Sequence, residues 1–219
     1  MLKLGEKGAI PQRGEDSYTI APHIPGGFVT PALLRKIADV SEKFDAKALK
    51  ITGATRIAIV GLKEADIDAA WEELGMVEGA AVGLCIRSIR TCPGNGFCRL
   101  GQQDAVEIGL KIDKKYHAYQ LPGKFKMAVS GCKLSCSESW VRDIGLIGDK
   151  DGWIVTIGGN VGATPRIGKE LIRGLNDETV LTAVDTVIEY YKENAKKGER
   201  LGKMIERVGL EPFQQAVGV

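Results

Sequence analysis

Four cysteines in two closely spaced pairs are the residues of this sequence best suited to chemistry. Five residues separate Cys92 from Cys98, and three separate Cys132 from Cys136, with glycines within or beside both pairs. Four thiolates on glycine-rich loops can hold a [4Fe-4S] cluster, because each iron takes one ligand and glycine lets backbone N–H groups approach the sulfides. Structural zinc sites more often use C-x2-C or C-x4-C pairs, so zinc is an alternative with less suitable spacing.

The fifth cysteine, Cys85, has a different environment. It stands between Leu84 and Ile86 in a segment that predicts a strand. A cysteine outside disulfides behaves as a small hydrophobic residue, so we expect Cys85 to be a buried thiol rather than a fifth ligand. An odd number of cysteines also favours metal or redox chemistry over a disulfide framework.

Positive charge is concentrated in the same part of the chain. The whole sequence has 30 Lys and Arg against 28 Asp and Glu, a net charge of +2. The segment from Ile86 to Lys133 carries nine basic and three acidic residues, so it holds +6 and the remainder −4. The near-neutral total disfavours a nucleic-acid partner, whereas the local excess predicts a site for something anionic.

The first 80 residues predict a small α+β unit. A Thr30 N-cap followed by Pro31 marks the start of a helix that runs to about Phe44. The other predicted elements are a strand at 18–21, a turn at 25–27, strands at 49–52 and 56–60, and an amphipathic helix at 67–74. This order suits helices packed on one face of a mainly antiparallel sheet.

Beyond a boundary near residue 80, two predicted strands lead directly to the cysteine pairs. They span 84–90 and 125–130, with a helix at about 102–115 between them. Further strands at 144–147 and 153–157 lead to the loop at 158–160, and a last helix with Asn176 or Asp177 as its N-cap carries apolar residues from Val180 to Tyr191.

The sequence shows no pattern typical of a membrane span or a secretory signal. No apolar run reaches the ~18 residues of a membrane span, and residues 1–6 lack the apolar stretch of a secretory signal. We therefore expect a cytoplasmic protein with no membrane partner.

Taken together, the motifs resemble those of the sirohaem and [4Fe-4S] nitrite/sulfite reductase family, most closely its small single-module assimilatory-type sulfite reductases. The resemblance is carried by residues 91–98, 124–126, 130–136 and 158–160, and upstream by 25–27 and 50–57. It implies an α+β chain, with a ferredoxin-like half-domain at 1–80 followed by an α/β sirohaem- and [4Fe-4S]-binding domain at 81–219.

The resemblance also implies roles for the four paired cysteines. Cys92, Cys98, Cys132 and Cys136 match the cluster ligands of the family. Cys136 matches the cysteine whose sulfur also bridges to the sirohaem iron, which couples a one-electron relay to the metal that holds the substrate.

Four further positions match or approach the family's contacts to sulfite or nitrite. Arg56, Lys124 and Lys126 match directly, and the two lysines are expected on one face of a strand because they are two residues apart. His23 stands where the family often has arginine; it could donate a proton but lacks the fixed fork of a guanidinium. Ile57 replaces a polar residue of many large enzymes, and these positions do not separate sulfite from nitrite.

Sirohaem is a polycarboxylate, which gives the basic segment a partner. The expected cation contacts are Arg87, Arg90, Arg99, Lys133 and Arg166. Asn95 and Asn160 are expected to donate hydrogen bonds to the cluster or the macrocycle.

The predicted activity is the six-electron reduction of sulfite to sulfide. The alternatives are reduction of nitrite to ammonia and a non-catalytic iron–sulfur electron-transfer subunit of a larger reductase. No flavin or nicotinamide motif is present, so an external electron donor, a ferredoxin or a flavoprotein, is expected. Large family members close the cofactor site between two modules, so a homodimer or a partner subunit is expected here.

Overall fold

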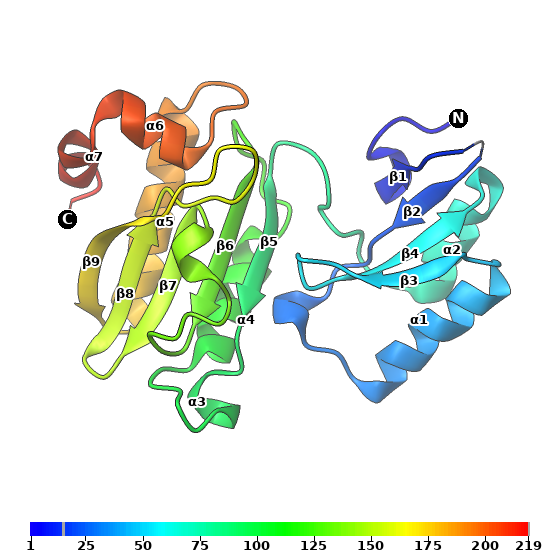
Figure 1. Ribbon diagram of the computed structural model, residues 1–219, viewed down its shortest axis with the longest axis horizontal. Helices are drawn as coiled ribbons and strands as arrows, with labels where there is room; N and C mark the ends of the chain where they lie inside the picture. The colour runs from blue at the N-terminus through cyan, green and yellow to red at the C-terminus, as the bar shows by residue number, and fades with distance from the viewer. Residues whose placement is uncertain (15, 219) are drawn as a thin grey trace. The chain divides into compact units, whose positions relative to one another are not determined.

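The computed structural model describes residues 1–14 and 16–218 and divides the chain into two compact units, Met1–Gly83 and Leu84–Val219 (Figure 1). Each unit has its own hydrophobic core. We predicted the boundary near residue 80; the assignment of a separate function to each unit stays a prediction.

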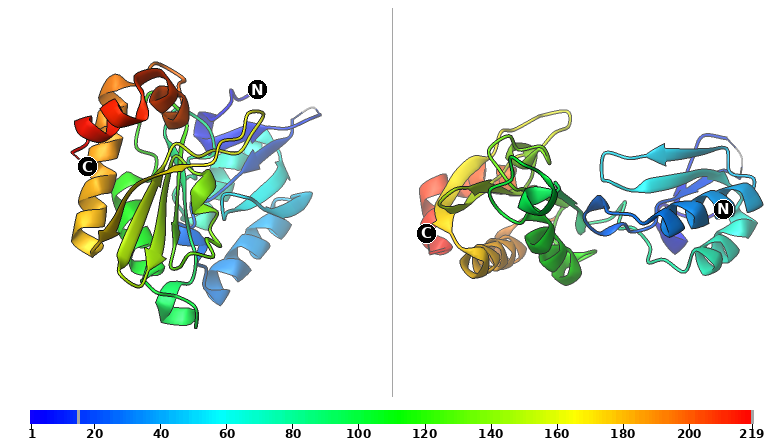
Figure 2. Two further views of the ribbon diagram at one scale, coloured as in Figure 1. Left: turned by 60° about the vertical axis from the view of Figure 1, so that its left-hand side comes forward. Right: turned by 90° about the horizontal axis from the view of Figure 1, so that it is seen from below.

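The first unit is a four-stranded antiparallel sheet in the order β1-β2-β4-β3 with two helices. Its elements are η1 (Glu6–Gly8), β1 (Ala9–Pro11), β2 (Tyr18–Ile20), η2 (Pro25–Gly27), α1 (Pro31–Lys43), β3 (Ala48–Ile51), β4 (Ile57–Leu62), η3 (Glu64–Asp66) and α2 (Ile67–Leu74). Both helices lie on one face of the sheet (Figure 2). The predicted arrangement of helices on one face of an antiparallel sheet is confirmed.

Local sequence signals explain the helices of this unit. Thr30 caps α1 by accepting a hydrogen bond from the Leu33 N–H at 3.1 Å, and Pro31 takes the first helical position. α2 ends at Gly75, which adopts the left-handed conformation that favours glycine.

The second unit is a mixed five-stranded sheet in the order β5-β6-β7-β8-β9. Its elements are β5 (Ile86–Thr91), α3 (Gly94–Phe97), α4 (Ala105–Tyr116), β6 (Phe125–Ser130), η4 (Ser139–Val141), β7 (Ile144–Asp149), β8 (Gly152–Ile157), β9 (Lys169–Leu175), α5 (Asp177–Asn194), α6 (Leu201–Val208) and α7 (Leu210–Ala216). β5, β6 and β7 are parallel, whereas β8 and β9 are antiparallel to their neighbours.

The two faces of this sheet are packed differently. Helices α4 and α5 lie on the same face (Figure 2), where large side chains such as Met127 and Leu146 enter the core. The alternate residues Ala128, Gly145 and Thr156 are small. Their size lets η4 approach the opposite face, where a Cβ atom on Gly145 would lie 2.2 Å from the Ser139 carbonyl oxygen.

Several elements are not predicted by the sequence analysis. β1 has three residues, and β9 buries only Leu171, so neither shows a clear alternation. α6 follows a polar run and has only eight residues, although Leu201, Met204 and Ile205 bury one helical face at the expected spacing. At α5, Asn176 is the N-cap, accepting hydrogen bonds from two backbone N–H groups.

Within the described residues, no helix is both long enough and apolar enough to cross a membrane.

Candidate functional site

Parallel pairing of β5 and β6 brings the two cysteine pairs together. Thr91 is in register with Val129, so the chain leaves both strands at the same edge of the sheet, at Cys92 and Gly131. The Cys92 N–H donates to the Val129 carbonyl at 3.1 Å, and the Gly131 N–H donates to the Cys92 Sγ at 3.0 Å. A backbone N–H aimed at a cysteine sulfur stabilises a thiolate, as iron–sulfur ligands require.

Glycines let the two cysteine loops pack backbone against backbone. A Cβ atom on Gly131 would lie 2.8 Å from the Cα of Gly94, so neither loop has room for a side chain there. Gly94 has φ +60° and lies against Ala105 at the start of α4. The Gly131 carbonyl accepts hydrogen bonds from the N–H groups of Gln102 and Gln103. The loops are therefore fixed to each other and to the start of α4.

The five cysteine thiols differ in exposure. Cys92 and Cys132 are half-buried and Cys98 and Cys136 are exposed, while Cys85 is 3% exposed, which confirms the expected core thiol. Across residues 1–14 and 16–218, no three His, Cys, Asp or Glu side chains gather as they would around one metal ion. A [4Fe-4S] cube takes each thiolate on a different iron, so its ligands need not converge on one point as those of a mononuclear zinc site do.

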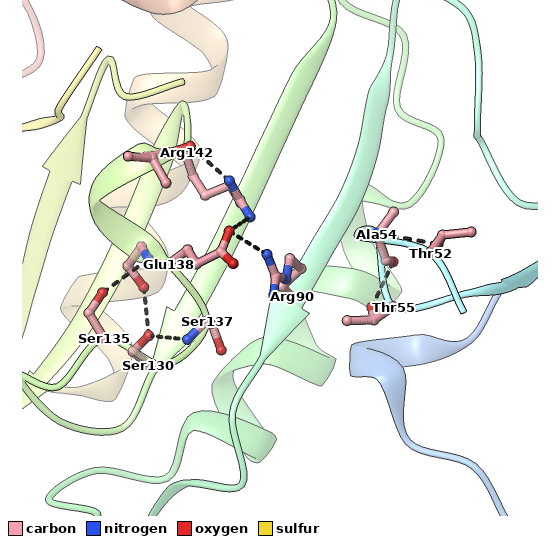
Figure 3. A network of polar contacts seen from close by, with 11 residues as sticks. Thr52, Ala54, Thr55, Arg90, Ser130, Ser135, Ser137, Glu138 and Arg142 are labelled. Atoms are coloured by element: carbon pink, nitrogen blue, oxygen red, sulfur yellow. Dashed lines mark hydrogen bonds and ion pairs between the residues drawn. The ribbon is translucent and has the colours of Figure 1, made fainter. Parts of the chain in front are cut away.

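The loop that carries Cys136 is held by buried serines (Figure 3). The Ser137 N–H donates to Ser130 Oγ at 3.2 Å, and the Ser130 and Ser139 hydroxyls are 2.9 Å apart. Ser135 and Glu138 both adopt positive φ angles, +53° and +61°. Non-glycine residues rarely take this conformation, which indicates that the surrounding contacts force the shape of the loop.

Two arginines share one carboxylate next to this loop. Glu138 accepts hydrogen bonds from Arg90 at 2.7 Å and from Arg142 at 2.6 Å, as Figure 3 shows. Burial would raise the pKa of Glu138, but the two guanidinium groups outweigh it and place the pKa below its ordinary value. Among the described residues, the Nε atoms of both arginines are buried without a hydrogen-bond partner. One carboxylate for two guanidinium groups leaves an excess positive charge that fits a polycarboxylate cofactor.

The two predicted lysines alternate with buried residues at the start of β6. Lys124 and Lys126 are half-buried, whereas Phe125 and Met127 between and beside them are in the core. Burial lowers the pKa of Lys126 to about 8, with the charges of Lys124, Arg142 and others adding to the effect. The alternation in burial agrees with the expected spacing, although Lys124 lies just before β6. The contact of the lysines with substrate stays a prediction.

Asp143 and Arg200 complete this charged cluster and are not identified by the sequence analysis. The Asp143 carboxylate is fully buried and accepts hydrogen bonds from the Lys126 backbone N–H at 2.8 Å and from two nitrogens of Arg200 at 2.9 and 2.6 Å. Arg142 is likewise absent from the sequence prediction. All three take part in contacts over long sequence distances or lie in polar runs, so no local signal marks them.

In the first unit, the two predicted contact residues lie at one end of the fold. Arg56 is 4% exposed, and its backbone N–H donates to Thr52 Oγ1 at 3.2 Å in the β3–β4 turn, part of which is drawn in Figure 3. A Cβ atom on Gly27 would lie 2.8 Å from Thr55 of that turn. The segment that follows His23 therefore packs on the turn that carries Arg56.

The other predicted cofactor contacts have varied surroundings. Arg87 is half-buried, and burial lowers its pKa below the ordinary value. Arg99 and Asn95 are exposed on the first cysteine loop. Their roles stay predictions.

Besides Arg90, three further predicted contacts have partners within the chain. Lys133 forms an ion pair with Asp149 at 2.5 Å. The Asn160 side chain donates to the Thr164 carbonyl at 2.8 Å, and Arg166 forms a two-pronged pair with Glu206. A cofactor would have to share these groups with their present partners.

Comparison with known families identifies the class of protein. Residues 82–219 match the "Nitrite and sulphite reductase 4Fe-4S domain", and residues 10–77 match the "Nitrite/Sulfite reductase ferredoxin-like half domain". The chain belongs to the nitrite and sulfite reductase family of oxidoreductases, whose larger domain here is a 4Fe-4S domain. The predicted family and fold class are confirmed.

Individual relatives include reductases for both anions. The chain is 40% identical over 211 residues to "Sulfite reductase, assimilatory-type" of Nitratidesulfovibrio vulgaris, covering 96% of this chain and 97% of that protein. It is 38% identical over 203 residues to "Nitrite reductase [NAD(P)H]" of Bacillus subtilis, covering 93% of this chain but 25% of that protein.

Solved structures share the fold. The Mycobacterium tuberculosis NirA protein has a TM-score of 0.84 at 18% identity, over 96% of this chain and 44% of that one. Dissimilatory sulfite reductase I has a TM-score of 0.83 at 16% identity, over 93% of this chain and 69% of that one.

Proposed function

We propose that this protein is a sulfite reductase that uses sirohaem and a [4Fe-4S] cluster to reduce sulfite to sulfide. The observation that carries the proposal is the meeting of the two cysteine loops at one sheet edge, in a unit that also holds a buried excess of cations. The likeness to an assimilatory-type sulfite reductase over nearly the whole length of both chains supports sulfite as the substrate.

The proposed cofactor site uses residues of the second unit. Cys92, Cys98, Cys132 and Cys136 would hold the cluster, with Cys136 also the ligand shared with sirohaem. The cofactors would supply one-electron transfer and an iron that binds the anion. Arg90 and Arg142 would pair with sirohaem carboxylates through the charge that Glu138 leaves unbalanced.

The lysines account for the proton requirement of the reaction. Six electrons and seven protons convert sulfite to hydrogen sulfide ion and three waters, so the site must deliver protons as S–O bonds break. A Lys126 pKa of about 8 leaves the ammonium protonated at neutral pH yet able to give up its proton. Lys124 beside it offsets the charge of the anion.

Reduction of nitrite to ammonium is the second candidate, because a nitrite reductase is 38% identical over most of this chain. The two anions make the same demand for cations and protons. The electron donor is proposed to be a separate ferredoxin or flavoprotein for either reaction.

Spectra and rates test the proposal on protein purified without oxygen from a host that makes sirohaem. We expect tetrapyrrole absorption bands together with an iron–sulfur EPR signal. With a chemical reductant, we expect sulfide from sulfite with a higher kcat/KM than ammonium from nitrite. The reverse preference would favour the nitrite reductase, and no turnover of either anion by fully loaded protein would favour an electron-transfer subunit.

A further inference from the structure

Asp143 joins the strand of the two lysines to a distant part of the chain. One carboxylate oxygen accepts both the Lys126 backbone N–H and an Arg200 nitrogen, and the other accepts the Arg200 Nε at 2.9 Å. The Asp143 N–H in turn donates to the Lys126 carbonyl at 3.0 Å. The backbone of Lys126 is thus fixed by the Asp143 carboxylate, which forms a bidentate ion pair with the Arg200 guanidinium group.

The segment before Arg200 is itself bound to the residues before Lys124. The Gly198 N–H donates to the Pro122 carbonyl at 2.7 Å, and the Tyr191 hydroxyl donates to the Glu199 carbonyl at 2.5 Å. Gly123 lies so close to Glu199 that a side chain on Gly123 would collide with it. Residues 195–200, which we call the C-terminal clamp, therefore support the lysine strand over several residues.

The charges around Lys126 come from four elements or loops. Lys124 precedes β6, Arg87 is on β5, Arg142 follows η4, and Arg200 belongs to the C-terminal clamp; all four oppose protonation of Lys126. The nearby carboxylates are Asp143, paired with Arg200, and Glu138, paired with Arg142 and Arg90. The cations outnumber the carboxylates, so their repulsion favours the neutral form of an amine at this position.

We propose that Arg200 is a positioning residue of the anion site, which holds the lysine strand through Asp143 and, as a permanent cation, keeps the Lys126 ammonium ready to give up its proton. The role in anion reduction rests on the proposed function, whereas the contacts of Arg200 with Asp143 do not depend on it. A guanidinium suits the task because it does not deprotonate in proteins, so its field stays constant while Lys126 cycles between charged and neutral forms.

The test measures how readily Lys126 loses its proton in the intact protein, without requiring turnover. The rate of acetylation of each lysine by acetic anhydride is followed against pH by peptide mass spectrometry, since only the neutral amine reacts. In Arg200→Gln we expect the labelling rate of Lys126 at pH 8 to fall about fivefold, because removal of one nearby cation lets the ammonium keep its proton. Arg200→Lys, which keeps the charge, should restore most of the rate.

Matched controls separate this effect from a loss of folding. Arg173→Gln removes an exposed arginine paired with Glu170 on β9 and should leave Lys126 labelling unchanged, as should the exposed Lys203 within each protein. If Arg200→Gln does not fold, the same substitution is made in an Asp143→Asn protein; we expect Lys126 to be labelled more slowly in this double variant than in Asp143→Asn alone, because a cation is removed and no carboxylate is left unpaired.

Unchanged Lys126 labelling in folded Arg200→Gln would overturn the proposal, as would equal labelling rates in Asp143→Asn with and without Arg200→Gln. In the loaded enzyme, the alkaline limb of the rate against pH should move to higher pH in Arg200→Gln. If the native protein reduces neither anion, the proposed function fails, while the labelling result still decides the role of Arg200.

Discussion

Lys126 is held in a place that does not suit a protonated amine. Burial comes first among the causes that lower its pKa to about 8, and neighbouring cations come next. In the unfolded chain the same group has an ordinary pKa of about 10.5, so the unfolded state binds more protons between pH 8 and 10.5. Below pH 8, Lys126 therefore lowers the free energy of unfolding by its full amount. This loss becomes smaller as the pH rises toward 10.5.

Lys126→Met should raise the stability of the protein while it removes activity. At pH 7 we expect the Tm to rise by about 2–4 °C, and the gain should shrink at pH 10. The rate of anion reduction should fall about 100-fold, because a proton donor is lost. Thermal unfolding at both pH values and steady-state rates check the two parts. A lower Tm at pH 7 would contradict the argument, and Lys203→Met at an exposed position is the control.

Cys136→Ser should uncouple the two proposed cofactors. A serine hydroxyl is a poor replacement for a thiolate shared between two metal centres, so we expect interacting EPR signals from the native protein and separate signals from Cys136→Ser. Cys85→Ser is the matched control, because Cys85 is a core thiol. It should keep the coupling and lose only about 1–2 kcal/mol of stability. Coupling that survives in Cys136→Ser would show that another residue is the bridge.

At the scale of elements, the close approach of the two cysteine loops depends on β5 and β6 running in parallel. Both loops leave the carboxyl edge of the sheet, where open α/β sheets commonly place their sites. The contact between Gly94 and Gly131 then sets the spacing of the thiols. The geometry of the site is thus a property of two strand ends and two glycines.

Gly131→Ala should disturb the cluster site, whereas Gly96→Ala should not. A Cβ atom on Gly131 meets backbone atoms at 2.8 Å, while one on Gly96 meets nothing within 4 Å, although both glycines lie in cysteine loops. We expect Gly131→Ala to lose about 1–3 kcal/mol of stability and a large part of its iron. Thermal unfolding and iron content per chain measure both effects. Equal iron content in the two variants would contradict the role of the glycine contact.

Sequence reasoning could locate the cysteine loops and the lysine pair because each follows from a local pattern. Strand-forming runs precede both cysteine pairs, and the alternation of Lys124 and Lys126 with apolar residues fixes their face. Arg200 could not be found this way, since its partner Asp143 is 57 residues away and its own surroundings, 196–200, are polar. The pairing of Arg90 with Glu138 across 48 residues is hidden for the same reason.

At the scale of the whole molecule, the relatives differ in length, so this chain covers different shares of them. It spans 97% of an assimilatory-type sulfite reductase but only 25% of a nitrite reductase. The two units described here thus recur both as nearly an entire enzyme and as one part of a larger one. The match to the larger protein extends over 93% of this chain.

We predict that the loaded protein forms a homodimer or binds a partner subunit that helps to close the sirohaem site. Light scattering should then give active protein a mass clearly above 23.6 kDa, and twice that value for a homodimer. The same measurement on protein without cofactors shows whether assembly depends on loading. A strictly monomeric protein with full activity would contradict the need for a partner.

The tie between Asp143 and Arg200 also has a consequence for the order of biosynthesis. A chain leaving the ribosome presents both cysteine pairs, and then Asp143, well before Arg200 has been made. Until then, the Asp143 carboxylate has no guanidinium to balance it, and the strand of Lys124 and Lys126 lacks its support. Because Arg200 is synthesised after the cysteine loops, it completes the charge balance of a site whose proposed cluster ligands precede it in the chain.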